Sequence, residues 1–230
     1  MMRAFSRPAR PIWSMALKAL VFVLGVLGQY FGLRRNGFHV ARQLVYYTNI
    51  SNILITLLCG GLAFALCRHQ CAGTQARFSR WVGVLRFALA AGILLTFTVF
   101  SLLLTPMLNR SYLLSADNLL VHNAVPLLAA LDYILFDEGL EDGQPRIGWA
   151  YALPAAYFVL TLVLMQSGVR YAGGASAPYY FLNVRTLGWF GVKRGQLGVF
   201  WWVVILCLLH WVLARVLQGL RSMVKKHGER

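Results

Sequence analysis

The stretch from Tyr46 to Leu58 reads YYTNISNILITLL and sets small polar side chains inside a segment apolar enough to cross a membrane. At the period of an α-helix, Thr48, Asn52 and Thr56 fall on one stripe, while isoleucine and leucine cover the remaining surface. Polar groups are costly against lipid, so we expect this stripe to face other parts of the protein.

A second stretch, from Asn118 to Tyr133, reads NLLVHNAVPLLAALDY and has a similar design. Asn118, His122 and Pro126 are spaced four residues apart and therefore share one helical face. The two stretches therefore make a hydroxyl and an imidazole available to each other.

The composition identifies the class of protein. The 230 residues are 59% hydrophobic and 13% charged, and the mean hydropathy is +0.62, which is typical of a polytopic membrane protein. The net charge of +15 is scattered between apolar runs and forms no continuous basic face, so no nucleic-acid partner is expected. Membrane lipids with anionic headgroups are the expected partners of this charge.

Six apolar runs are each near the roughly 20 residues that cross a bilayer. We therefore predict an all-α, single-domain bundle of six transmembrane helices over residues 1–230. Between Ser167 and Gln196 lies a connection rich in aromatic residues and glycine, which we expect to cover the outer face. The helices are predicted at residues 12–33, 44–66, 82–108, 118–136, 147–165 and 197–217.

The basic residues predict the orientation, because positive charge gathers on the cytoplasmic side of a membrane protein. With both termini inside, 11 basic residues lie in inner segments and 8 in outer ones. Lys18, Arg86 and Arg215 each lie near the inner end of a helix and strengthen this bias. We expect both termini in the cytoplasm.

Thr48 and His122 are each the fifth residue of a run, and both runs cross the membrane in the same direction. Both side chains are therefore expected roughly 6 Å below the outer boundary of the hydrocarbon. A hydroxyl beside an imidazole suits acyl transfer, with Thr48 as nucleophile and His122 as general base. This chemistry needs no cofactor. Donors that could stabilise the oxyanion are Asn49, Asn52, Asn118, Tyr179 and Tyr180.

Three segments resemble one known family: YYTNISNIL from Tyr46, LLVHNAVPLLAALDYILF from Leu119 and PYYFLNVRTLGW from Pro178. They look like the marked segments of the prokaryotic six-transmembrane-helix membrane proteins, which are related to the androgen-induced integral-membrane hydrolases. The resemblance implies a threonine hydrolase of fatty acid esters of hydroxy fatty acids, with Thr48 and His122 in the catalytic positions.

The resemblance extends over the whole chain in helix order, and its loop segment departs from the family pattern. Bacterial members usually read YPFLDV where this chain reads YYFLNV. Tyr180 therefore stands at the usual proline and Asn183 at the usual aspartate, which makes Asn183 a further candidate for contact with substrate. The implied substrate is an amphiphilic, lipid-like ester.

Two other readings of the same residues stay open at this stage. A structural reading has Thr48 and His122 only joining neighbouring helices through hydrogen bonds. A second enzyme class would use His39, Asp117 and His122 as zinc ligands near the outer face. Histidine spacing does not favour this class, since no two histidines are three or four residues apart.

A binder or transporter of lipids or small molecules is the non-enzymatic alternative. Its support is Asp132, a carboxylate near the inner end of the fourth run, because buried acids mark proton paths in transporters. Arg86 and Lys18 are predicted at a similar depth, so an ion pair between Arg86 and Asp132 that locks helices together is the favoured interpretation.

Overall fold

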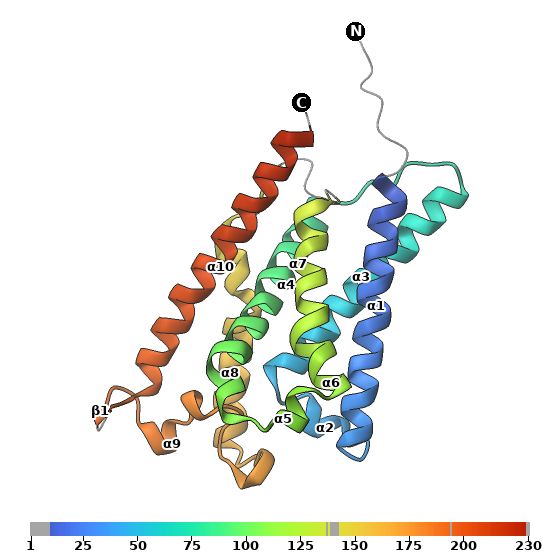
Figure 1. Cartoon of the computed structure of the whole chain (residues 1–230). Coiled ribbons are helices and arrows are strands. Elements are labelled where there is room, and N and C mark those ends of the chain that lie inside the picture. The colour runs from blue at the N-terminus through green and yellow to red at the C-terminus, as the bar shows by residue number, and fades with distance from the viewer. Residues whose placement is uncertain (1–9, 137, 139–142, 194, 229–230) are drawn as a thin grey trace.

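Among the residues that the structure describes, six helical segments are long and apolar enough to span a membrane, which confirms the predicted number. The computed structural model describes residues 10–136, 138, 143–193 and 195–228. Successive spans alternate in direction, so α1 begins and α10 ends at the same end of the bundle (Figure 1). We call this the terminal end, and the opposite end the loop end. The spans are Ile12–Arg35, Tyr47–Cys71, Arg80–Met107, Ala116–Leu135, Ile147–Gln166 and Val199–His227.

Helices α1 (Arg10–Arg35) and α3 (Tyr47–Cys71) pack closely because small residues lie between them. A side chain at Gly25 would collide with the Thr56 hydroxyl, and one at Gly60 would come within 2.5 Å of the Phe22 ring. Close approach through small residues is typical of helices that associate within a membrane. The one-turn helix α2 (Val40–Gln43) connects this pair at the loop end.

The third and fourth spans both change to π-helical hydrogen bonding near the loop end. In the third, α4 (Arg80–Val99) continues into the π segment η1 (Phe100–Leu104). The fourth is built from α6 (Ala116–Leu119), the π segment η3 (Leu120–Ala124) and α7 (Val125–Leu135). Single π turns are frequent at functional sites. The short η2 (Thr105–Met107) and α5 (Arg110–Leu113) join the two spans.

The last two spans are joined by a long connection at the loop end. The fifth span is η4 (Ile147–Tyr151) followed by α8 (Ala152–Gln166), and the sixth is α10 (Val199–Gly228). The connection packs onto the bundle, because Phe181 and Leu182 are buried in one cluster with Tyr47 and Tyr157. Its elements are η5 (Ala172–Gly174), η6 (Tyr180–Leu182), α9 (Val184–Leu187) and the two-residue antiparallel strands β1 (Val192–Lys193) and β2 (Gln196–Leu197).

Two predicted boundaries were wrong by several residues. The second span begins at Tyr47, because a turn separates it from α2, and it extends to Cys71. The sixth was predicted to end at Leu217 but extends to Gly228. Its extension has a tertiary cause: the Arg221 guanidinium donates to the carbonyls of Tyr133 and Phe136 at 2.9 and 2.7 Å.

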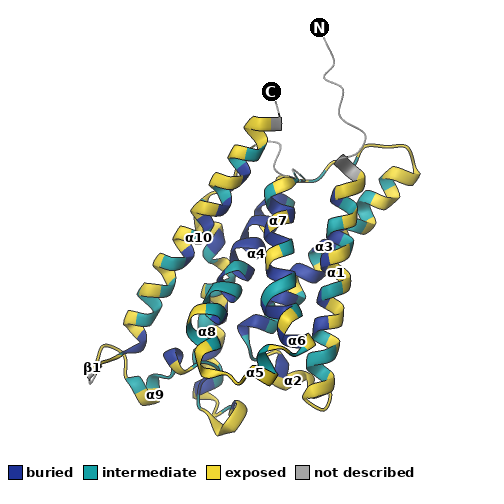
Figure 2. Ribbon diagram, in the orientation of Figure 1, coloured by how far each residue is buried: buried dark blue, intermediate teal, exposed yellow. Residues whose placement is uncertain are grey.

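Burial is concentrated in the centre of the bundle, where α4 has more buried residues than the other described helices, followed by α3 and α7 (Figure 2). Phe87, Ala91 and Val125 are fully buried, whereas Leu57 and Leu208 are each 62% exposed. An exterior covered with large apolar side chains suits contact with lipid rather than water. The fold and this exterior define a multi-pass integral membrane protein.

Candidate functional site

Thr48 lies in the first turn of α3, at the loop end of the bundle. The chain is extended at Tyr46 and becomes helical at Tyr47, so the N–H of Thr48 is among those without an acceptor inside the helix. Both this N–H and the Thr48 hydroxyl lie 3.5 Å from the Tyr179 hydroxyl, which makes two weak hydrogen bonds. The positive end of the helix dipole also favours negative charge at this point.

A cavity of about 230 Å³ lies against Thr48, between α3, α4, α8, α10 and the connection at the loop end. Its lining is mainly apolar and includes Leu95, Phe100, Phe158 and Val203. Pockets lined by apolar side chains with a few placed polar groups are typical of sites for small molecules.

Most hydroxyls in the lining are used elsewhere. The other tyrosines bond to backbone carbonyls, and Thr96 pairs with Ser51 across two helices at 3.0 Å. Thr48 and Tyr179 differ, because their hydroxyls meet each other only at the limit of hydrogen-bond distance. They therefore have capacity left for a ligand. The occupied tyrosines are Tyr47, bonded to Gly92, Tyr151, bonded to Cys207, and Tyr157, bonded to Val45.

Tyr179 is held in place by other rings. It stacks in parallel on Phe181 at 5.3 Å and meets the edge of Tyr46 at 6.2 Å. Burial raises the pKa of Tyr179 to about 12, against the opposing effect of the hydrogen bond with Thr48. At neutral pH the phenol is thus a hydrogen-bond donor and not a base.

His122 lies in the π segment η3 and is buried, with its ring stacked on Phe100 at 3.7 Å. Its Nδ1 atom has no hydrogen-bond partner among the described residues. Within the described part of the chain, no hydrogen bond joins His122 to Thr48. Phe100 links the two regions, because it lines the cavity and also contacts the imidazole.

Asn52 connects the two polar stretches directly. Its side-chain amide donates to the carbonyl of Thr48 at 2.8 Å and to the carbonyl of Val121 at 2.9 Å. Thr48 is therefore tied to the residue that precedes His122. Because both amide hydrogens are used, Asn52 holds α3 against η3 and has no hydrogen left for an oxyanion.

The remaining predicted donors lie at different places. The Asn118 amide donates to Leu113, and that of Asn49 donates to Gln43. Asn183 caps α9 through its side-chain oxygen, and Tyr180 lies outside the cavity lining. Among the six candidates for contact with the oxyanion or the substrate, Tyr179 is the one whose side chain reaches the Thr48 hydroxyl within the described residues.

The zinc ligands proposed from the sequence do not form a group. Asp117 pairs with Arg35 at 2.6 Å, and His39 is exposed at the start of α2. Within the residues that the structure describes, no three His, Cys, Asp or Glu side chains are placed to hold a metal ion.

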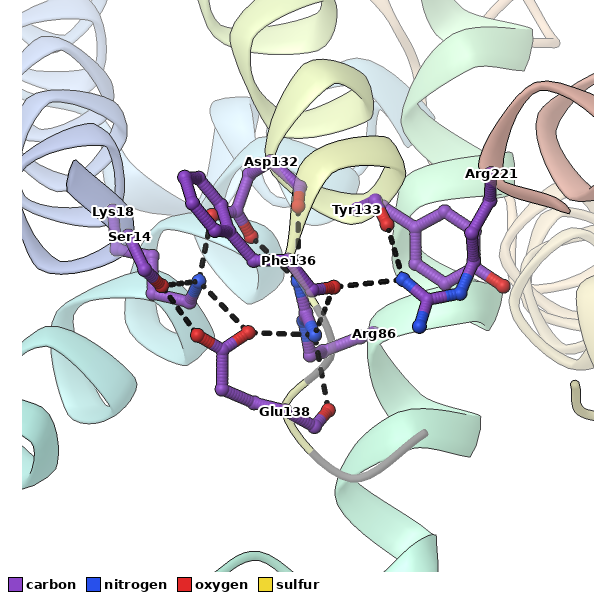
Figure 3. Close-up of polar contacts among 8 residues, drawn as sticks. All are labelled: Ser14, Lys18, Arg86, Asp132, Tyr133, Phe136, Glu138 and Arg221. Atoms are coloured by element: carbon purple, nitrogen blue, oxygen red, sulfur yellow. Dashed lines mark hydrogen bonds and ion pairs between the residues drawn. The ribbon is translucent and has the colours of Figure 1, made fainter. Parts of the chain in front are cut away.

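A second polar region, the charged cluster, lies at the terminal end and consists of Ser14, Lys18, Arg86, Asp132 and Glu138 (Figure 3). Lys18 Nζ lies 2.7 Å from Asp132 and 3.2 Å from Glu138. Arg86 lies 3.1 Å from Asp132 and 2.9 Å from Glu138, and Ser14 donates to Glu138. Each acid therefore bridges both cations.

Sequence reasoning paired Arg86 with Asp132 but gave no role to Glu138. A signal was present, because two cations at one depth faced a single acid, and an acidic loop followed Asp132 in the chain. Burial alone would raise the pKa of Glu138, but Arg86 and Lys18 outweigh it and hold that pKa below its usual range.

The chain has no match among models of protein families, curated proteins or solved structures. The chemistry of the site therefore rests on its own residues. Thr48 supplies a hydroxyl at a helix N-terminus, Tyr179 supplies a protonated phenol, and the cavity supplies an apolar wall. Together these groups can bind a molecule with one polar end and one apolar end.

Proposed function

We propose that this protein is an intramembrane hydrolase of lipid-like esters, with Thr48 as nucleophile and His122 as general base. One observation carries the proposal: the Thr48 and Tyr179 hydroxyls lie together in the wall of a largely apolar cavity that opens within the membrane-spanning bundle. The resemblance of the polar stretches to the threonine hydrolases agrees with it.

The reaction is an acyl transfer in two stages. The Thr48 oxygen bonds to the ester carbonyl carbon while its proton passes to the base, and the carbonyl oxygen becomes an oxyanion. The Tyr179 O–H and the Thr48 N–H are the donors placed to stabilise this charge. The alcohol then leaves with the proton, and water hydrolyses the acyl-threonine to release the acid.

The role of His122 requires it to reach Thr48 directly or through one water. Phe100 stacks on the imidazole and lines the cavity. A change in the rotamer of Phe100 would therefore open a route between His122 and Thr48. Both rings lie in π segments, where the helical hydrogen bonding already departs from the α-helical pattern.

A binding protein without catalysis is the second candidate function. The observation that favours it is the lack of a hydrogen bond between Thr48 and His122, whose Nδ1 atom has no partner among the residues that the structure describes. In this case the cavity would bind the same kind of amphiphile, and the two hydroxyls would hold its polar end.

We further propose that both termini lie in the cytoplasm of a bacterium and that Thr48 lies near the outer face of the inner membrane. The excess of basic residues on the terminal side supports this orientation. Two thiols test it in intact cells treated with an impermeant maleimide. We expect Cys71, at the terminal end of α3, to stay unlabelled, and a cysteine introduced by Ala175→Cys to react. The opposite pattern would reverse the orientation.

Hydrolysis of fatty esters by purified protein tests the catalytic proposal. We expect Thr48→Ala to abolish turnover and Thr48→Ser to keep part of it, because serine retains the oxygen but loses the methyl group that fixes the rotamer. Thr98→Ala is the matched control, since the Thr98 hydroxyl bonds to Leu94 of its own helix and lies outside the cavity lining. Full hydrolysis by folded Thr48→Ala would refute Thr48 as the nucleophile, and folded wild-type protein that hydrolyses no ester would leave the binding function.

A further inference from the structure

The walls of the cavity differ sharply in exposure. The inner wall comes from α3 and α4, where Thr48, Leu95 and Phe100 are buried. The outer wall comes from α8 and α10, where the lining residues Ala155 and Cys207 are exposed. The cavity therefore opens sideways between α8 and α10, and not along the axis of the bundle.

A hydrogen bond at one end and contacts between aromatic rings at the other limit this opening. Toward the terminal end, the Tyr151 hydroxyl donates to the carbonyl of Cys207 at 2.9 Å. Toward the loop end, Trp202 packs on the rings of Tyr180 and Phe181 at 5.9 and 5.8 Å. Between these contacts α8 and α10 leave a lateral portal, which we define by Ala155 and Cys207.

The lateral portal lies within two candidate membrane spans, Ile147–Gln166 and Val199–His227. Its surroundings are apolar and exposed, as Val159 (60%) and Leu208 (62%) illustrate. A molecule that enters through it therefore comes from the hydrocarbon region of the bilayer and not from water.

We propose that the lateral portal admits one acyl chain of a membrane amphiphile, whose polar end then meets Thr48 and Tyr179. This inference rests on the proposed function for the chemistry at the polar end, but the binding site stands on its own geometry. The cavity, at about 230 Å³, is smaller than the roughly 300–1,000 Å³ of pockets for drug-sized ligands. That size suits a single slender chain inside the cavity and not two chains side by side.

Photolabelling of the full-length protein in phospholipid nanodiscs tests this inference. The probe is a single-chain fatty ester with a diazirine in its chain, and unlabelled ester serves as competitor. We expect saturable labelling in the α10 peptide that contains Val203 and Leu206, which line the cavity.

Two neighbouring alanines of α8 provide the variant and its control. Ala155 lines the lateral portal, whereas Ala156 is exposed but lies outside the lining. We expect Ala155→Trp to lose the saturable labelling and Ala156→Trp to keep it. Unchanged labelling in Ala155→Trp would overturn the inference.

Two further results keep the inference separate from the catalytic proposal. Thr48→Ala should still be labelled at α10. If Thr48→Ala is labelled and also hydrolyses ester, the result refutes catalysis by Thr48 but supports the lateral portal. If Ala155→Trp does not fold, the positions labelled in the wild-type protein decide. Saturable labelling confined to the outer face of α1, at Trp13 or Leu20, would contradict the proposed route.

Discussion

The charged cluster at the terminal end and the Thr48 site at the loop end are both buried and polar, yet they are built in opposite ways. In the charged cluster, both acids bridge both cations, and the Lys18 and Arg86 side chains are at most 3% exposed. At the Thr48 site, the hydrogen bond between the Thr48 and Tyr179 hydroxyls is long, and His122 Nδ1 has no partner within the described part of the chain.

This difference separates a structural role from a functional one. Buried polar groups are normally satisfied, and an exception calls for an explanation such as a catalytic or binding role. Fully paired charges inside a membrane protein hold helices together, here α1, α4 and α7. The unsatisfied groups at the Thr48 site are those that can still bind a ligand.

The largest expected effect comes from breaking the charged cluster at Asp132. Among the described residues, Asp132→Asn leaves Lys18 and Arg86 with Glu138 as the acid that pairs with them, so we expect the free energy of unfolding to fall by about 3–5 kcal/mol. Unfolding of detergent-solubilised protein measures this loss. Activity should decrease only in proportion to the folded fraction.

Asp117→Asn is the matched control, because it also removes an acid from an ion pair. Its partner Arg35 has a side chain that is 39% exposed, so the loss should be only about 0–1 kcal/mol. A stable Asp132→Asn protein that lost a proton-coupled flux would instead assign the charged cluster to transport.

The next effect concerns the base. We expect His122→Gln to lower kcat by roughly 10²–10⁴-fold, with little further loss when it is combined with Thr48→Ala, because the two residues act as one unit. His210→Gln is the control, since His210 is also buried but bonds to the carbonyl of Ala150. Equal losses in both histidine variants, or additive losses in the double variant, would remove His122 from the reaction.

The smallest effect is the pH dependence of the charged cluster. The pKa of Glu138 lies below its usual 4.5, so the stabilisation by its carboxylate is complete above this pH and is lost as pH falls through the lower folded-state value. At neutral pH, Glu138→Gln should lower the free energy of unfolding by about 1–3 kcal/mol. The stability of this variant should then depend less on pH in the acid range than that of the wild type. An unchanged acid dependence would refute the stabilising role of the Glu138 carboxylate.

The sequence predicted those features that follow from helical period and depth. The six spans, the polar stripe with Thr48 and the partnership of Arg86 with Asp132 are of this kind. Both ions lie near the ends of long apolar runs, where the register of a helix leaves few choices of partner.

Features set by loops and side-chain packing could not be predicted in this way. The contact between Tyr179 and Thr48 depends on how a long connection folds back, and the stacking of Phe100 on His122 depends on two π turns. The extension of α10 depends on the contacts that Arg221 makes with carbonyls of the fourth span and its end, which lie far away in the sequence.

Covalent labelling with a fluorophosphonate probe tests most directly whether the Thr48 site is catalytic. Such probes react with activated hydroxyl nucleophiles, so we expect one adduct on the folded wild-type protein, located on Thr48 by peptide mass spectrometry. The adduct should be absent from Thr48→Ala and present in the control Thr98→Ala. Folded wild-type protein that forms no adduct, or forms one at another residue, would contradict the assignment of Thr48 as the nucleophile.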